Sequence, residues 1–378
     1  MGRSLAYCAM FGCLLVCRPG ADTSADEPVG STVKESLRTV RAVDHFGEGN
    51  AAAREAVDRL GKLPASQLAS VLHAFKDANP IARNYLRNAA EQIFTRERDQ
   101  ISLDELVRFA ADTSQDPQAR KMVVEWVREE SPTRADELID RFLSDPSGEL
   151  RRDAVARRVD RAENLLEQEQ FDLARDVYQE ALGGAVHEDQ VKAIVAALGD
   201  LDVEVDIAEH LGLLREWQVI GPFDNTDTGG FDVAYPPESK FEPTASYAGK
   251  LGEVRWQPIE TDDDFGVVDI AKSFENWKGS AVYLTTTFDS SENRRAQLRL
   301  GTANAYKIWV NGEFVFGREE YHRGKRLDQY LVPIDLVRGE NRFLIKLLQN
   351  EQTQDWAQAY TVQVRVTDGA GAAIRPAQ

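Results

Sequence analysis

The chain has 378 residues, of which 29% are charged and 42% are hydrophobic, so it can form two or three globular domains of ordinary composition. Its formal net charge of −18 argues against nucleic acids and anionic membranes as partners, because it would repel such polyanions. The charge is compatible with neutral or cationic partners and selects none of them.

The N-terminus is typical of a secretory signal peptide. Arg3 precedes a mostly apolar run from Leu5 to Cys17, which is shorter than the roughly 20 residues of a membrane-spanning helix. Small residues follow, and Thr23-Ser24-Ala25 resembles a cleavage site. We therefore predict that residues 1–25 are removed and that the protein is exported to the periplasm or the exterior of a bacterial cell.

All the cysteines of the chain lie in this segment, at positions 8, 13 and 17. The mature chain would then contain no disulfide framework, no thiol nucleophile and no thiolate metal site. It would also contain no transmembrane segment. The alternatives are an uncleaved anchor and lipidation of Cys17, although Val16 replaces the small residue that usually precedes a lipidated cysteine.

Residues 26–32 are small, polar and acidic, and they are predicted to form a disordered leader. Helical periodicity then extends over residues 33–214. For example, Ala52, Ala56 and Leu60 are spaced as on one buried helix face.

An Asx-Pro pair recurs in this helical part, at Asn79, Asp116 and Asp145, and each copy predicts a helix N-cap followed by a proline in the first turn. Each copy also precedes a basic residue and an apolar helix face. A repeated helix-pair unit predicts an α-solenoid, in which each repeat packs on its neighbours and the array presents a surface for a protein partner. The third copy resembles the second helix of a HEAT repeat, and Phe171–Leu182 resembles a tetratricopeptide helix. A plain helical bundle is the alternative.

The residue pattern changes at Arg215, beyond which five of the six tryptophans lie. Asn311-Gly312 separates two β-rich runs and predicts a hairpin with a type I′ turn. At least eight short strands over residues 215–378, without intervening helices, predict an antiparallel β-sandwich or jelly roll. We expect the first strand at Glu216–Ile220 and one continuous strand at Val254–Glu260.

Three motifs in this part are Leu300-Gly301, the turn Trp309–Gly312 and the segment Leu336–Asn341. With the strand order around them, they resemble the galactose-binding-like jelly roll, and they are similar to the sugar-binding domain of family 2 glycoside hydrolases. The resemblance covers residues 280–366, and more weakly 215–280. The whole chain resembles bacterial secreted proteins that join HEAT-like repeats to such a domain. The resemblance implies the jelly-roll fold, whose members bind carbohydrates, bind proteins or act as structural spacers.

The polar loop Glu319–Tyr330 follows the hairpin, and Trp356 and Tyr360, which lie in the segment Asn350–Tyr360, are expected to form a second side of a site. Loops at one end of a sandwich often carry ligand contacts, and sugars are bound by aromatic faces together with planar hydrogen-bonding groups. The alternative is a solvated loop, with Trp356 filling the interior of the sandwich. The candidate ligand-binding residues are Tyr321, His322, Arg323, Arg326, Asp328, Trp356 and Tyr360.

Two acidic loops are candidates for a structural calcium site, since calcium binds several oxygen ligands. Asp224 and Asp227 belong to the first loop, which resembles part of an EF-hand loop but lacks the closing glutamate. Asp262 and Asp264 belong to the second. Asx-rich turns are the alternative. No other cofactor is expected.

No complete catalytic motif is present: the sequence contains no GxSxG, P-loop, GxGxxG after a strand or HExxH. We therefore predict an exported, non-catalytic binding or scaffold protein, whose helical array binds protein and whose jelly roll binds a carbohydrate or another cell-surface polymer. The alternatives are a glycoside-active enzyme or accessory subunit with a site at the domain junction, and a structural assembly protein without a glycan ligand. Exposed aromatic rings at Tyr321 and Trp356 would favour the sugar-binding function, and burial of both would favour assembly.

Overall fold

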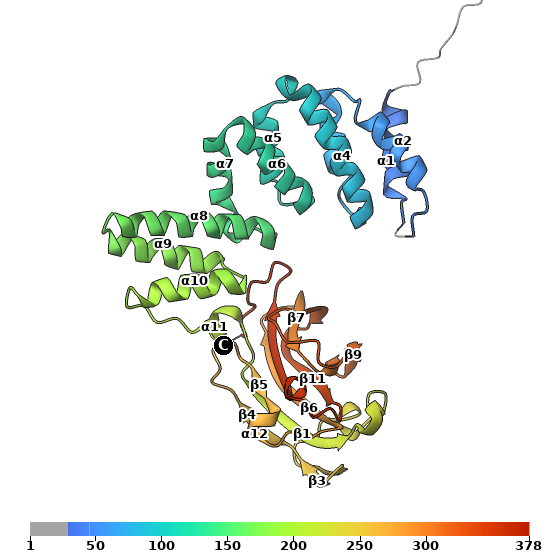
Figure 1. Cartoon of the computed structure of the whole chain (residues 1–378), viewed down its shortest axis with the longest axis vertical. Coiled ribbons are helices and arrows are strands. Elements are labelled where there is room, and N and C mark those ends of the chain that lie inside the picture. The colour runs from blue at the N-terminus through green and yellow to red at the C-terminus, as the bar shows by residue number, and fades with distance from the viewer. Residues whose placement is uncertain (1–28, 45, 378) are drawn as a thin grey trace, which may run out of the picture. The chain divides into compact units, whose positions relative to one another are not determined.

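The computed structural model describes residues 29–44 and 46–377, and it confirms the predicted order of helices followed by an antiparallel β-sandwich (Figure 1). The predicted signal peptide lies outside the described residues. The predicted leader is wrong where it is described, because helix α1 (Val29–Arg41) begins at Val29. Val33 and Val40 are buried on its apolar face. In an α-helix the N–H of Val33 donates to the carbonyl four residues earlier, so the helix includes the turn that begins at Val29. No helix in the described ranges is both long enough and apolar enough to cross a membrane.

Contacts divide the chain into two compact units, one up to Ile101 and one from Ser102 onward. The first unit is helical. Asn79 caps α4 as predicted, since its side-chain oxygen accepts a hydrogen bond from the N–H of Ala82 at 2.9 Å and Pro80 is the first helical residue. The described elements of this unit are α1, α2 (Asn50–Leu60), η1 (Ala65–Gln67), α3 (Leu68–His73), α4 (Pro80–Glu97) and η2 (Arg98–Gln100).

The second unit begins with further helices, which pack as successive neighbours along the chain (Figure 1). They are α5 (Leu103–Ala111), α6 (Pro117–Glu130), α7 (Pro132–Ile139), η3 (Asp140–Ser144), α8 (Gly148–Glu167), α9 (Phe171–Gly184), α10 (Glu188–Gly199) and α11 (Ile207–Leu211). Their assignment to HEAT or tetratricopeptide repeats stays a prediction.

The third predicted helix cap is wrong. Helix α8 begins at Gly148, and Ser147 is its N-cap. The carboxylate of Asp145 instead accepts two hydrogen bonds from the guanidinium of Arg120, at 3.0 and 2.6 Å. Both side chains are buried, and a buried guanidinium requires a counter-ion more strongly than a helix end requires a cap.

The sandwich consists of a six-stranded sheet in the order β4-β1-β6-β11-β8-β9 and a four-stranded sheet in the order β10-β7-β12-β5, with a separate β2–β3 hairpin. The main core lies between the two sheets and includes Leu284, Leu298, Ile345 and Val364. The strands are β1 (Glu216–Asp224), β2 (Ser246–Gly249), β3 (Gly252–Arg255), β4 (Gln257–Glu260), β5 (Val268–Asp269), β6 (Ser280–Ser290), β7 (Arg294–Thr302), β8 (Ala305–Val310), β9 (Glu313–Arg318), β10 (Tyr330–Leu336), β11 (Gly339–Gln349) and β12 (Thr361–Thr367). Short helical turns are η4 (Thr226–Thr228), η5 (Pro236–Glu238), α12 (Ile270–Ser273) and η6 (Asp355–Ala357).

The predicted hairpin is confirmed: Asn311 and Gly312 have φ of 53° and 86°, as a type I′ turn requires. Two strand predictions need correction. Strand β1 does not end at Ile220, because a register shift lets it continue along β6 so that Phe223 is buried opposite Ala281. The run over residues 254–260 forms two strands that separate at Trp256, since β3 pairs with β2 and β4 pairs with β1.

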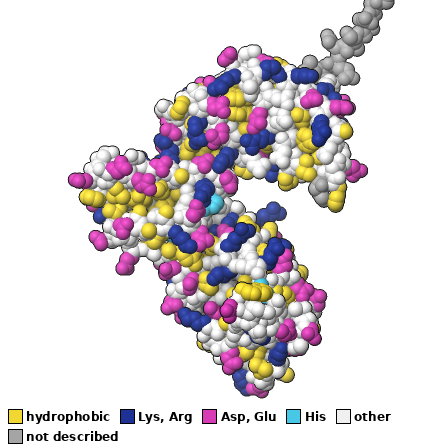
Figure 2. Space-filling model, viewed as in Figure 1, with side chains coloured by type: hydrophobic (Ala, Val, Ile, Leu, Met, Phe, Trp, Pro, Cys, Tyr) yellow, Lys and Arg dark blue, Asp and Glu magenta, His cyan; other side chains and the backbone are white. Residues whose placement is uncertain are grey.

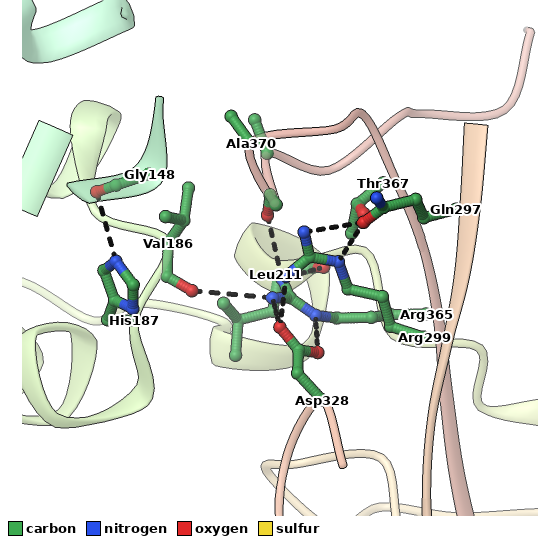
Figure 3. Close-up of polar contacts among 12 residues, drawn as sticks. Gly148, Val186, His187, Leu211, Gln297, Arg299, Asp328, Arg365, Thr367 and Ala370 are labelled. Carbon is green, nitrogen blue, oxygen red and sulfur yellow. Dashed lines mark hydrogen bonds and ion pairs between the residues drawn. The ribbon is translucent and has the colours of Figure 1, made fainter. Parts of the chain in front are cut away.

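A buried charge cluster joins the last helices to the four-stranded sheet (Figure 3). Arg365 on β12 is 1% exposed. It donates hydrogen bonds to both carboxylate oxygens of Asp328, with 2.7 Å between Nε and Oδ1. It also donates to the backbone carbonyls of Leu211 in α11, at 3.2 Å, and Val186, at 3.5 Å. Arg299 on β7 donates to the same carboxylate at 2.6 Å. The cluster therefore ties two strands, the loop before β10 and the helices together.

Replacing Asp328 with Asn should lower the free energy of unfolding by about 3–5 kcal/mol, because it leaves the buried guanidinium of Arg365 without a counter-ion. Urea unfolding followed by tryptophan fluorescence measures this loss, since most tryptophans lie in the sandwich. The exposed Asp335 on β10 provides a control, and Asp335→Asn should change stability by less than about 0.5 kcal/mol. Equal losses in the two variants would contradict the role assigned to the cluster.

The carboxylate of Asp328 should also make the free energy of unfolding depend on pH. Burial alone would raise the pKa of Asp328, but the hydrogen bonds and charges of Arg365 and Arg299 outweigh burial and hold the pKa below its usual value of 3.8. Because the pKa is lower in the folded state, the stabilisation is complete above the pKa of the unfolded chain and is lost as pH falls through the folded value. Between pH 5 and pH 2 the free energy of unfolding should fall more in the wild type than in Asp328→Asn, as urea unfolding at each pH measures. Parallel curves of unfolding free energy against pH for the two proteins would contradict this prediction.

Candidate functional site

Three segments meet at one end of the sandwich. They are residues 319–329 after β9, residues 350–358 after β11 and residues 225–230 after β1. Each follows the end of a strand of the six-stranded sheet, and the sheet therefore places them side by side.

Hydrogen bonds between side chains hold the first segment against the other two. The fully buried Asn225 donates from Nδ2 to the hydroxyl of Tyr321 at 3.2 Å and to the carbonyl of Gln349 at 3.0 Å. His322 donates from Nε2 to Oδ1 of Asn350 at 2.8 Å. Burial raises the pKa of Tyr321, so its hydroxyl keeps its proton at neutral pH and can serve as a hydrogen-bond donor.

An exposed aromatic group lies on this framework. The Trp356 side chain is 62% exposed, and its ring meets the ring of His322 edge to face, with 5.2 Å between the centroids. The alternative in which Trp356 fills the interior of the sandwich is therefore wrong. The next residue, Ala357, takes the buried position instead, and its carbonyl accepts hydrogen bonds from Lys278 and Gln349. This arrangement turns Trp356 outward.

A polar cleft of 520 Å³ adjoins this framework, because Asn350, the partner of His322, forms part of its wall. Amides, carboxylates and hydroxyls line the cleft, and they supply both donors and acceptors for a polyhydroxylated ligand. The lining residues are Asp227, Thr228, Asn350, Glu351, Gln352, Thr353 and Gln354. We call Trp356, His322, Tyr321 and this cleft the aromatic–amide site.

Two of the predicted ligand residues, Tyr360 and Asp328, are not available to a surface ligand. Tyr360 is fully buried in the core, where its hydroxyl donates to the carbonyl of Leu347 at 3.0 Å, so no surface ligand can reach it. Asp328 belongs to the buried cluster with Arg365 and Arg299, and its oxygens are occupied there. Both predictions were wrong because proximity in sequence does not show which way a side chain points.

Arg323 and Arg326 lie on the first segment, but they line a different cleft together with Arg318 and Lys325. The sequence prediction missed these two additional cations. It also missed the amides of residues 350–354, although the unbroken polar run after an apolar strand was a usable signal.

The predicted calcium site has no support in the structure. Asp224 binds the ammonium of Lys250 at 3.1 Å, and the same ammonium contacts the hydroxyl of Thr226 at 3.0 Å and the carbonyl of Gly279. The hydrogen bond from Thr226 and the contact with Lys250 hold the pKa of Asp224 below its usual range. A lysine thus supplies the positive charge that a cation would bring to this loop.

The other predicted calcium ligands do not form a cluster either. Asp227 lies in the polar cleft, while Asp262 and Asp264 are exposed on a separate loop. Between them, Asp263 accepts hydrogen bonds from the N–H groups of Phe265 and Val267, which is the Asx-turn alternative. Within residues 29–44 and 46–377, no group of three or more His, Cys, Asp or Glu side chains is arranged to hold a metal ion.

Comparisons with known proteins identify no family. No family model matches the chain, and no curated protein matches it. Solved structures that resemble it include a β-glucosidase from Kluyveromyces marxianus in complex with glucose, with 10% identity over 40% of this chain and 16% of that chain, and a TM-score of 0.22. A family 35 carbohydrate-binding module from Clostridium thermocellum has 17% identity over 23% of this chain and 78% of that module, with a TM-score of 0.16. A β-glucuronidase from an uncultured Clostridium sp. has 13% identity over 41% of this chain and 28% of that chain, with a TM-score of 0.24. Similarity at this level assigns no function, which has to be argued from the residues themselves.

Millimolar calcium should leave the melting temperature of the protein unchanged, because Lys250 already neutralises Asp224. Thermal unfolding in calcium and in a chelator measures this. Lys250→Met provides the comparison, since it removes the ammonium and should destabilise the loop. A rise in melting temperature with calcium in the wild type would contradict the assignment.

Proposed function

We propose that the sandwich binds a carbohydrate at the aromatic–amide site and that the protein acts as an exported binding protein without catalysis. The single observation that carries the proposal is the exposed ring of Trp356, which His322 and Asn350 connect to a polar cleft. A large indole is usually buried, since its apolar area contributes most to stability away from water. Trp356 is thus available for stacking on a ligand.

The combination of surfaces matches the two faces of a sugar ring. The C–H groups of a pyranose form an apolar face that can pack on an indole, and its hydroxyl groups need donors and acceptors at its edge. The amide and carboxylate groups of Asn350, Glu351 and Gln352 provide both kinds of partner. The hydrogen bond between His322 and Asn350 connects the Trp356 ring, which His322 contacts, to this wall of the cleft.

The framework supports binding because much of it is held in place before a ligand arrives. Asp227 donates its backbone N–H to Glu351 at 2.7 Å, and Gln358 donates to the carbonyls of Thr353 and Gln354, at 2.6 and 2.8 Å. A site that is ordered in advance loses less conformational entropy on binding. Export rests on the N-terminal sequence alone, where Arg3 precedes an apolar run, and it would bring the sandwich into contact with extracellular glycans.

Replacing Trp356 with Ala should weaken glycan binding by about 5- to 150-fold, because stacking on an aromatic ring contributes about 1–3 kcal/mol in comparable contacts. A glycan array with the full-length protein identifies a binder, and calorimetry then measures its affinity for both proteins. Phe314→Ala removes another exposed aromatic ring, on β9, and should leave the affinity unchanged. Binding that survives in Trp356→Ala, or that is lost equally in Phe314→Ala, would refute the proposed site.

A further inference from the structure

A second cleft in the sandwich has a basic lining. Its volume is 610 Å³, and it holds four cationic side chains and no carboxylate. Figure 2 shows several Lys and Arg side chains together on the upper part of the sandwich, on a chain whose formal net charge is −18. We call the cleft of 610 Å³ the basic cleft. Its lining residues are Arg318, Arg323, Gly324, Lys325, Arg326, Gln329 and Tyr330.

Only part of this positive charge is paired with a carboxylate at close range. Glu320 binds Arg318 through both oxygens, at 2.7 and 2.8 Å, and approaches Arg323 at 3.4 Å. Among the described residues, no carboxylate lies within ion-pair distance of Lys325 or Arg326, although Asp263, Asp269 and Glu188 act on the charge of Lys325 from a greater distance. The donors of at least two cations therefore remain available to a ligand.

The backbone of the basic cleft is held in a defined conformation. Gln329 donates from its amide to the carbonyl of Gly324 at 3.1 Å and accepts from the N–H of Thr302 at 3.2 Å. Gly324 has φ of 75°, which closes the turn between Arg323 and Lys325. The carbonyl of Arg326 packs so closely on Gly301 of β7 that a Cβ there would collide with it. The cations therefore project from a fixed loop.

Asp328, the carboxylate nearest to Arg326 in the sequence, is occupied elsewhere. Asp328 lies two residues after Arg326, but its oxygens are held by Arg365 and Arg299 in the buried cluster. Burial lowers the pKa of Lys325, an effect that nearby carboxylates such as Asp263 partly oppose. A lysine in this situation gains from an anionic partner.

The basic cleft begins where the aromatic–amide site ends. Arg323 in the cleft directly follows His322, whose ring contacts Trp356. The two sites therefore share one loop.

We infer that the basic cleft binds the carboxylate or sulfate group of an acidic sugar, so that the ligand of the sandwich is an anionic oligosaccharide. This inference rests on the proposed function. Guanidinium groups bind planar carboxylates and sulfate oxygens through paired hydrogen bonds, and a volume of 610 Å³ accommodates a sugar residue rather than an inorganic ion alone. A short anionic segment is favoured over a long polyanion, because a long polyanion would extend past the cations of the cleft onto the surface of a chain with a net charge of −18, which repels further anionic groups.

Calorimetry with the full-length protein tests the inference. One arm compares tetragalacturonate with its fully methyl-esterified form, which removes the charge and keeps the sugar chain. The other arm compares a sulfated galactan tetrasaccharide with its desulfated form. In at least one arm the charged form should bind about tenfold more tightly than its neutral counterpart, and 0.5 M NaCl should reduce this advantage. The arm that shows the advantage identifies the anionic group.

Two double variants with the same change of charge locate the effect. Arg323→Gln with Arg326→Gln should abolish the preference for the charged form while neutral binding persists. Arg255→Gln with Arg338→Gln alters exposed residues outside the cleft and should keep the preference. Trp356→Ala should weaken binding of both forms.

Each failure points to a different error. Equal affinity for charged and neutral forms, with loss of both in Trp356→Ala, would overturn the basic cleft and leave the proposed function intact. A charge preference that persists in the Arg323→Gln, Arg326→Gln protein would also overturn the cleft. The absence of any binding in both arms would overturn the inference together with the carbohydrate function on which it rests.

Discussion

A guanidinium buried between the last helices and the four-stranded sheet constrains much of this molecule. Moving a charged group out of water costs several kcal/mol unless its hydrogen bonds are replaced. Arg365 meets this requirement with the carboxylate of Asp328 and with backbone carbonyls of Val186, Leu211 and Gly371. Strand β12 provides the cation, while the helices and loops around it provide the acceptors. These segments therefore adopt one common arrangement within the second unit.

The same cluster shapes the functional end of the sandwich. The loop after β9 is anchored at one end by the contact between His322 and Asn350, and at the other by Asp328 in the buried cluster. Arg323 and Arg326 lie between these anchors. Because the carboxylate of Asp328 is occupied, it does not neutralise them. A locally basic surface on a strongly acidic chain thus follows from where a single aspartate is buried.

Local patterns in the sequence predicted the elements well. Asn311-Gly312 predicted its hairpin, since the turn conformation depends on two adjacent residues. Asn79 and Asp116 likewise predicted helix caps, each with a proline at the first helical position. Asp145 has the same local pattern, but Arg120 takes its carboxylate and Ser147 caps the helix. The pattern failed there because the competing partner lies 25 residues away.

The order of helices and strands and the position of the polar loops could be predicted from the amino-acid sequence, because they depend on periodicity and on residues close together in the chain. Which side chains face a ligand became clear from the three-dimensional fold. It buried Tyr360, exposed Trp356 and gave Asp224 a lysine as its partner. It also separated the aromatic–amide site from the basic cleft. The physical reason is that the direction of a side chain and its ion-pair partner depend on which strands and loops meet in space, and these meetings join residues that lie far apart in the sequence.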